Sequence, residues 1–218
     1  LEILLPEIST MKGIEQGERY HPEGDVFVHT LLCLDKLEER TPVTCWATLL
    51  HDVGKPPTCD RTPGKLTFYG HDKVGAEMAE EICRRFRFSN EATRHIVEVV
   101  LRHMKFMNAE EWRQSTMRRF LSSDTIEEDL AVHKADCLGS FGELSNYEIV
   151  RQALEDFHQR HEDPLPPPLL TGHDLIAIGM KPGPKFGEIL ADVQEQQLED
   201  ALETKEDALE YVREKYEA

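Results

Sequence analysis

Several histidines of this chain lie among apolar residues, and two of them have an aspartate close by in the sequence. These are His29, His51 followed by Asp52, His103, and His133 three residues before Asp136. A single buried histidine is usually a hydrogen-bonded core residue. Several together are satisfied more simply by a shared cation, because each ring has two nitrogens that need partners. Imidazole and carboxylate together suit divalent cations such as Mn, Fe, Co, Ni or Zn, with Mg also possible.

The doublet His51-Asp52 stands at the end of an apolar run and is followed by Gly54 and Lys55. Adjacent residues on a helix point about 100° apart, so these two side chains would not chelate one ion as an i, i+4 pair does. They can converge at a helix end or contact two ions. A bound metal with open positions lowers the pKa of water and polarises a phosphoryl oxygen, which is the chemistry of phosphate-ester hydrolysis.

The elements that must position these residues are helices, and the sequence predicts an all-α fold. Apolar residues at helical spacing, with start and stop signals, predict helices over 25–37, 43–53, 71–86, 90–104, 112–122, 126–138 and 146–160 and shorter ones around 172–178, 183–196 and 205–216. Thr41-Pro42 and Ser89 are start signals, and Thr125 with Glu128 fits a capping box. The Pro-, Gly- and Thr-rich stretch 55–68 indicates a loop, with a short extended piece at 65–69.

The bulk composition is that of an ordinary globular chain. Its 218 residues, 39% of them hydrophobic, suffice for one domain or one domain with a small appendage. No run approaches the roughly 18 apolar residues of a membrane span, and no signal peptide is recognisable, so we expect a cytoplasmic protein without membrane contact. Five scattered cysteines suit reduced thiols. Because residue 1 is Leu, we expect a processed chain or part of a longer one.

The charge distribution limits the class of partner. A net charge of −17 argues against a general nucleic-acid binder, because phosphate contacts come from Lys and Arg. Residues 84–119, however, contain nine basic and four acidic residues. An anionic substrate could therefore still be bound in the middle of the chain.

The order of these ligand-type residues resembles the pattern that names the HD superfamily of metal-dependent phosphohydrolases. His71 and His103 fall where two-metal members of that superfamily carry two further histidines. The resemblance implies an HD-domain helical bundle with a small C-terminal helical appendage. It also implies one or two divalent metal ions (Mn, Ni, Co, Fe, Zn or Mg), the first held by His29, His51, Asp52 and Asp136, the second by His71 and His103 with Asp52 bridging.

Cationic residues near these motifs are candidates for phosphate binding. Lys55 resembles the lysine that often follows the doublet in the superfamily and would contact substrate phosphate or the attacking water. Arg102 and Lys105, together with Arg118 and Arg119, could form a phosphate-receiving rim. The alternative is that they are solvated surface side chains.

A closer resemblance covers nearly the whole chain. The stretches 4–8 and 17–29 are similar to the lead-in of the HD domain in bacterial tRNA nucleotidyltransferase and poly(A) polymerase family proteins, and 169–190 is similar to their C-terminal helical segment. This implies a lead-in segment at 1–20, the HD domain at 21–162, a Pro-rich linker at 163–168 and a C-terminal helical segment at 169–218. The family's nucleotide-adding head, with its Gly-Ser loop and paired aspartates, has no counterpart here, so nucleotide addition is not expected of these residues.

Two main functions follow. The first is a metal-dependent phosphohydrolase acting on phosphate mono- or diesters of nucleotides or RNA ends, as a 2′,3′-cyclic phosphodiesterase, 2′-nucleotidase or phosphatase, with Asp52 and Lys55 catalytic. The alternative is a non-catalytic RNA-binding or dimerising body domain, with a tRNA contact and a homodimer both compatible with it. A nucleotide-sensing or signalling hydrolase would share the metal site and stays open.

Overall fold

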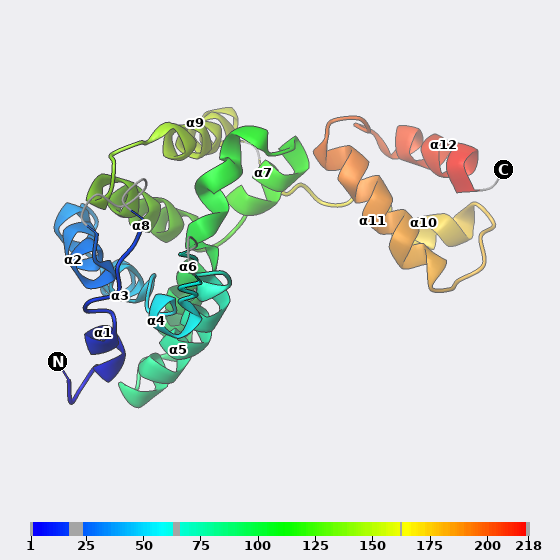
Figure 1. Ribbon diagram of the computed structural model, residues 1–218. Helices are drawn as coiled ribbons and strands as arrows, with labels where there is room; N and C mark the ends of the chain where they lie inside the picture. Colours follow the sequence, from blue (N-terminus) through cyan, green and yellow to red (C-terminus); the bar gives the residue numbers. More distant parts are fainter. Residues whose placement is uncertain (1, 18–23, 63–65, 162, 217–218) are drawn as a thin grey trace. The chain divides into compact units, whose positions relative to one another are not determined.

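The computed structural model describes residues 2–17, 24–62, 66–161 and 163–216, and within these ranges it contains helices but no strands (Figure 1). The predicted all-α class is confirmed. The helices are α1 (Pro6–Thr10), α2 (Val26–Lys36), α3 (Pro42–Leu50), α4 (Lys55–Thr58), α5 (His71–Arg85), α6 (Asn90–Arg102), the 3-10 helix η1 (His103–Glu111), α7 (Gln114–Leu121), α8 (Ile126–Gly139), α9 (Ser145–Arg160), α10 (Gly172–Ala177), α11 (Lys185–Leu198) and α12 (Lys205–Tyr216).

Local capping explains where two of the central helices begin. Thr41 and Thr44 form a capping box at the start of α3, with Pro42 in its first turn. The Ser89 hydroxyl accepts a hydrogen bond from the Ala92 backbone N–H at the start of α6. Both start signals predicted from the sequence are therefore confirmed.

The capping box predicted at the start of α8 is wrong. Thr125 is the N-cap residue but makes no side-chain cap hydrogen bond. Its hydroxyl instead donates to Asp129 Oδ2 at 3.0 Å, while Glu128 lies 3.3 Å from His95 Nδ1. The Thr125 hydroxyl is thus hydrogen-bonded to the buried Asp129 side chain, whereas the sequence pattern predicts a hydrogen bond from a backbone N–H of the first helical turn.

The region after α3 also differs from prediction. The helix ends at Leu50 rather than at 53, and the expected loop at 55–68 begins with the short helix α4. Two prolines fit there because the first turn of a helix needs no backbone N–H donors. Of the extended piece expected at 65–69, residue 65 lies outside the described residues, as does part of the family-like stretch 17–29. Thr67 pairs with Asp60 in an isolated antiparallel bridge.

The chain divides into two compact units. Unit 1 comprises Leu1–Glu110 and Asp124–Gln152, and unit 2 comprises Glu111–Ser123 and Ala153–Ala218. The units place α7 and the second part of α9 with the C-terminal helices, whereas the resemblance assigned both to the central domain. The boundaries at 1–20, 21–162, 163–168 and 169–218 stay predictions.

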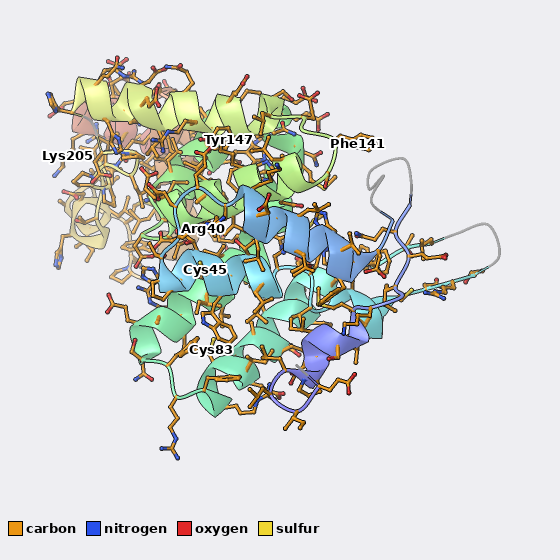
Figure 2. All side chains as sticks on the ribbon, turned by 90° about the vertical axis from the view of Figure 1, so that its left-hand side faces the viewer. Arg40, Cys45, Cys83, Phe141, Tyr147 and Lys205 are labelled. Carbon is orange, nitrogen blue, oxygen red and sulfur yellow. The ribbon has the colours of Figure 1, made fainter. Side chains whose placement is uncertain are left out.

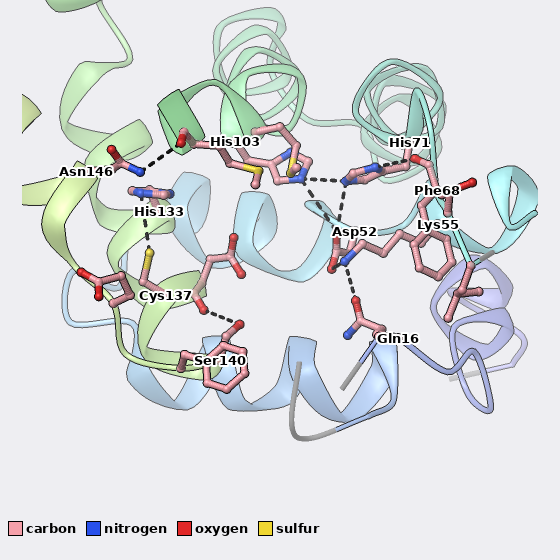
Figure 3. A pocket seen from close by; sticks show the side chains of 18 residues that line it. Gln16, Asp52, Lys55, Phe68, His71, His103, His133, Cys137, Ser140 and Asn146 are labelled. Atoms are coloured by element: carbon pink, nitrogen blue, oxygen red, sulfur yellow. Dashed lines mark hydrogen bonds and ion pairs between the residues drawn. The ribbon is translucent and has the colours of Figure 1, made fainter. Parts of the chain in front are cut away.

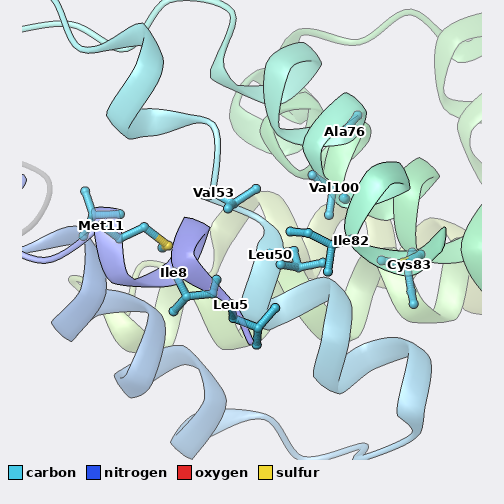
Figure 4. Close-up of a cluster of buried hydrophobic side chains, with 12 residues drawn as sticks. Leu5, Ile8, Met11, Leu50, Val53, Ala76, Ile82, Cys83 and Val100 are labelled. Carbon is cyan, nitrogen blue, oxygen red and sulfur yellow. The ribbon is translucent and has the colours of Figure 1, made fainter. Parts of the chain in front are cut away.

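The core of unit 1 surrounds the end of α3. Leu50 and Val53 are fully buried and pack with Ile82 of α5 and Val100 of α6 (Figure 4). Helix α3 also contacts α2 and α8, so it lies in the middle of the bundle. The apolar run at its end therefore anchors the two residues that lie between Leu50 and Val53, His51 and Asp52.

A glycine lets this anchored end approach helix α5 closely. A Cβ added to Gly54 would collide with the His71 carbonyl oxygen and lie 2.6 Å from the Gly75 nitrogen. Real Cβ atoms do not make such contacts, so any larger residue would push the two segments apart. Gly54 thus brings Asp52 next to the first residue of α5, His71.

Unit 2 has its own apolar core. Leu175 of α10, Ile189 and Val193 of α11 and Val212 of α12 are buried together. Helix α7 is joined to the end of α11 by polar contacts, among them the hydrogen bond from Ser115 Oγ to Glu195 at 2.7 Å. Across the described residues of both units, no helix combines the length and apolar character that crossing a bilayer requires.

Candidate metal centre

The six predicted ligands come from five places in the bundle and meet at one cluster in unit 1, of which Figure 3 shows Asp52, His71 and His103. His29 lies on α2 and Asp136 on α8. His51 and Asp52 directly follow α3, His71 begins α5, and His103 begins η1. All four histidines and Asp52 are buried. The structure thus brings together every residue that the sequence nominated as a ligand, and their role as ligands stays a prediction.

The first group consists of Asp136 with His29, His51 and Asp52 around it. The His29 Nε2 atom lies 2.9 Å from Asp136 Oδ1 and 3.3 Å from His51 Nε2. Asp52 turns its Oδ2 atom toward the same two rings, 3.2 Å from His51 Nε2 and 3.7 Å from His29 Nε2. Two imidazoles and two carboxylates therefore face one small volume.

His71 and His103 form a second group on the other side of Asp52. Their Nε2 atoms are 3.1 Å apart, and Asp52 Oδ1 lies 3.5 Å from His71 Nε2 and 3.8 Å from His103 Nε2. The two oxygens of one carboxylate thus face two separate groups of histidines. This is the position that a carboxylate bridging two cations would take.

The backbone fixes which ring nitrogen of three histidines carries the proton. The Nδ1 atoms of His51, His71 and His103 lie 2.6 to 2.8 Å from the carbonyl oxygens of residues 48, 68 and 100. Because a carbonyl oxygen only accepts, Nδ1 must donate, and Nε2 of a neutral ring presents a lone pair. Facing lone pairs at 3.1 Å repel each other unless a cation or proton lies between them, so the donor set fits a metal ion.

The electrostatics of the two groups differ. Burial lowers the pKa of His71, and burial together with the neighbouring His51 lowers that of His103 to about 4, so both rings are neutral near pH 7. Burial also acts to lower the pKa of His51, but the carboxylates of Asp52 and Asp136 outweigh it and raise the pKa to about 9. The first group therefore favours positive charge, whether a proton or a cation, and the second offers neutral ligands.

Lys55 is buried beside Asp52 rather than exposed on a loop. Its Nζ donates to Asp52 Oδ2 at 2.7 Å and to Gln16 Oε1 at 2.5 Å. Burial alone would raise the pKa of Asp52, but His51 and Lys55 hold it well below its usual range. The carboxylate is therefore ionised near pH 7.

Two residues of this site were missed by the sequence reasoning. Cys33 is fully buried, and its Sγ lies 3.4 Å from His29 Nε2, close enough to join the first group. The available signal was its position four residues after His29, which is one helical turn. Gln16 contacts Lys55 from 39 positions away in the sequence, and no local pattern marks it.

Two of the residues predicted to form a phosphate-receiving rim, Arg102 and Lys105, do not line the cavity beside the cluster. Arg102 contacts the buried Asp129, with Nη2 3.3 Å from Oδ2, and Lys105 is exposed; neither lines the adjoining cavity. Arg118 and Arg119 belong to unit 2, where they contact Asp200 and Glu195. A substrate-binding role for Arg102 and Lys105 stays a prediction without support from their contacts.

A cavity of about 610 Å³ opens onto the cluster within unit 1. Asp52, Lys55, His71, His103 and Asp136 form part of its wall. This volume suits a small organic ligand. The fold and the site together define an all-helical protein with a buried His/Asp centre of metal-binding type beside a ligand-sized cavity.

Comparison with known proteins identifies the family. Residues 68–212 match the family model described as tRNA nucleotidyltransferase domain 2, putative. The chain is 34% identical over 229 residues to the A-adding tRNA nucleotidyltransferase of Deinococcus radiodurans, covering 98% of this chain and 51% of that protein. It is 34% identical over 218 residues to the CC-adding tRNA nucleotidyltransferase of Thermus thermophilus, covering 95% and 48%. The chain belongs to the tRNA nucleotidyltransferase family and spans about half the length of these relatives.

Proposed function

We propose that this chain is the helical body region of a tRNA nucleotidyltransferase-type protein and that its His/Asp centre is an HD-type divalent-metal site that hydrolyses phosphate mono- or diesters of nucleotides or RNA ends. The observation that carries the hydrolase proposal is the position of Asp52. Its two carboxylate oxygens face two histidine groups on the wall of a cavity large enough for a nucleotide. A purely structural metal site has no need of such an open wall.

Each side chain has a distinct part in this proposal. His29, His51, Asp52 and Asp136 would hold one cation, and His71 and His103 with Asp52 would hold another. Cations held there supply Lewis acidity toward a phosphoryl oxygen and an activated water. Lys55 keeps Asp52 oriented through its 2.7 Å contact and, because it also lines the cavity, contributes positive charge where an anionic phosphate would enter.

The comparisons favour a second candidate, in which the region is a non-catalytic body that contacts tRNA or forms a dimer. The relatives are named for adding nucleotides to tRNA and not for hydrolysis. In this case the buried centre would serve stability alone. The two candidates share a metal site but differ in whether phosphate esters are turned over.

Metal analysis combined with hydrolysis assays separates the two candidates. We expect the purified chain to contain a divalent metal and, with Mn or Ni added, to hydrolyse 2′,3′-cyclic AMP, 2′-AMP or p-nitrophenyl phosphate. Asp52→Ala should reduce hydrolysis to background and lower the metal content while helicity measured by circular dichroism is retained. Asp35→Ala, at a mostly exposed carboxylate of α2, is the matched control and should change neither quantity.

Bound metal without hydrolysis of any of these esters would support the non-catalytic body instead. Binding of tRNA that Asp52→Ala leaves unchanged is expected under both candidates, so the assay of turnover decides between them.

A further inference from the structure

The cavity beside the metal centre has two ends of different chemistry. At one end Lys55 and Gln16 lie beside Asp52. The other end lies next to Asn146, His133 and Cys137, on the far side of Asp52 from Lys55 and Phe68 (Figure 3). The six-residue centre needs only the first end for a phosphate. The second end is therefore available for whatever the phosphate is attached to.

Exposed apolar side chains also line the cavity. Phe141 is 56% exposed, Met107 55% and Met104 37%, and all three line the cavity. Phe141 projects from the loop that follows α8 (Figure 2). An aromatic ring and polarizable thioethers are the surfaces on which flat aromatic ligands stack.

Two buried polar atoms at this end have no hydrogen-bond partner among the residues that the structure describes. The Asn146 Nδ2 atom donates to the Met107 carbonyl at 3.1 Å, which fixes the amide so that its Oδ1 remains an acceptor, and that Oδ1 is buried and unpaired. His133 is more than nine-tenths buried, its ring stacks on Phe106 at 4.0 Å, and its Nδ1 is also unpaired. Unpaired buried polar atoms cost free energy, and both residues line the cavity, so a ligand with matching groups would satisfy them.

Charge fixes the direction in which a phosphorylated ligand would lie. Among the described residues that line the cavity, Lys55 carries a fixed positive charge and lies beside Asp52, whereas the acidic Glu143 comes three positions before Asn146 in the sequence. Asp52 and Asp136 also line the cavity, so an anionic phosphate would be attracted to the end near Lys55 only with the proposed cations bound at the His/Asp centre. The neutral remainder of the ligand is thereby directed toward Phe141 and Asn146.

We propose that Phe141, Met104 and Met107 with Asn146 form a nucleobase subsite, in which a base stacks on the apolar side chains and donates an N–H hydrogen bond to Asn146 Oδ1. This inference rests on the proposed function, because it takes the phosphate of the same nucleotide to lie at the His/Asp centre. It adds to that function the residues that would bind the base of the nucleotide. Phe141 and Asn146 are then residues that determine specificity and not groups that react.

The test compares ligands with and without a base. Calorimetry in the presence of Mn would measure the binding of 2′-AMP, supplied as a phosphonate analogue that cannot be hydrolysed, and of inorganic phosphate to wild-type protein, Phe141→Ala and Asn146→Ala. We expect each substitution to weaken 2′-AMP binding about tenfold, as loss of a stacking or hydrogen-bonding contact to a base does. Binding of inorganic phosphate and the metal content should not change. The matched controls are Tyr69→Ala and Asn90→Ala, which alter exposed residues that do not line the cavity.

Equal 2′-AMP binding by wild type and both variants would overturn the subsite, as would wild-type protein that binds 2′-AMP no more tightly than phosphate. Parallel loss of phosphate binding in the variants would also overturn it, because the residues would then act on the whole site. If the variants lose 2′-AMP selectively but wild-type protein hydrolyses no ester, the subsite is supported and the hydrolase proposal fails.

Discussion

At the scale of single residues, the orientation of the histidines is built into the backbone around them. His51, His71 and His103 each direct Nδ1 at the carbonyl of the residue three positions earlier, at 2.6 to 2.8 Å. Each ring thus has one nitrogen committed to its own helix or turn and the other turned toward Asp52. Rings held this way need little reorganisation to bind a cation.

The division of the six ligand-type residues into two groups predicts two metal ions per chain. We expect the double variant His71→Ala/His103→Ala to bind one divalent ion per chain where wild-type protein binds two, because the first group keeps all its ligands. Inductively coupled plasma mass spectrometry after dialysis against Mn would give the stoichiometry. The control is His158→Ala/His173→Ala, at two exposed histidines. An unchanged stoichiometry in the first double variant would show that His71 and His103 hold no ion.

The candidate site was largely predictable from sequence because its residues are conspicuous. A histidine within an apolar helix, such as His29 or His103, stands out against its neighbours, and Asp52 follows one directly. Gln16 and Asn146 were not predictable, since each is an ordinary polar residue whose role comes only from long-range packing against Lys55 or Met107.

At the scale of elements, the close approach of the α3 end to α5 holds the two halves of the centre together. Gly54 lies against the Gly75 backbone, and Gly75 in turn has the Val100 side chain near it. The segment carrying His51 and Asp52 is thereby held against the helix that begins with His71.

Gly54→Ala should therefore destabilise the protein by about 1–3 kcal/mol, the usual cost of forcing an extra carbon into a packed interior. Urea unfolding followed by circular dichroism would measure the change in the free energy of unfolding. The matched control, Gly187→Ala in helix α11, adds a methyl group where no atom lies within 4 Å and should be neutral or slightly stabilising. Equal effects at the two positions would contradict the packing argument.

The longer helices were predictable to within a few residues, because caps such as Ser89 and the apolar periodicity agree with each other. The short elements were not. Helix α4 contains Pro56 and Pro57, which indicate a loop in any local pattern, and η1 begins where Arg102 ends an α-helical pattern without a stop signal. The capping box at Thr125 was also mispredicted, because its hydroxyl donates to the buried Asp129 side chain four residues later and makes no cap hydrogen bond.

At the scale of the whole molecule, an acidic chain with a net charge of −17 also buries carboxylates, and one of them makes stability depend on pH. Burial raises the pKa of Asp129 to about 7, although the nearby Arg102 acts to lower it. The folded state therefore holds a proton on Asp129 that the unfolded chain releases above its ordinary pKa of 3.8.

The sign of the effect follows from these two pKa values. The folded state binds more protons between pH 4 and pH 7, so the contribution of Asp129 to stability is full below pH 4 and is lost as the pH rises toward 7. Relative to Asp129→Asn, wild-type protein should lose up to about 1.4 kcal/mol of unfolding free energy per pH unit over this range. Urea unfolding of both proteins at several pH values would measure the difference, and parallel pH profiles would contradict it.

The dispersal of the six ligand-type residues has a consequence for assembly. They come from α2, the end of α3, the starts of α5 and η1, and α8, so a fragment that lacks any one of these elements lacks part of the set. Each proposed cation takes its ligands from at least three of these places, so it would bind only chains in which those places have come together, and by mass action it would shift the folding equilibrium toward the folded state. The metal content of a sample would thus report the fraction of chains in which these elements have packed together.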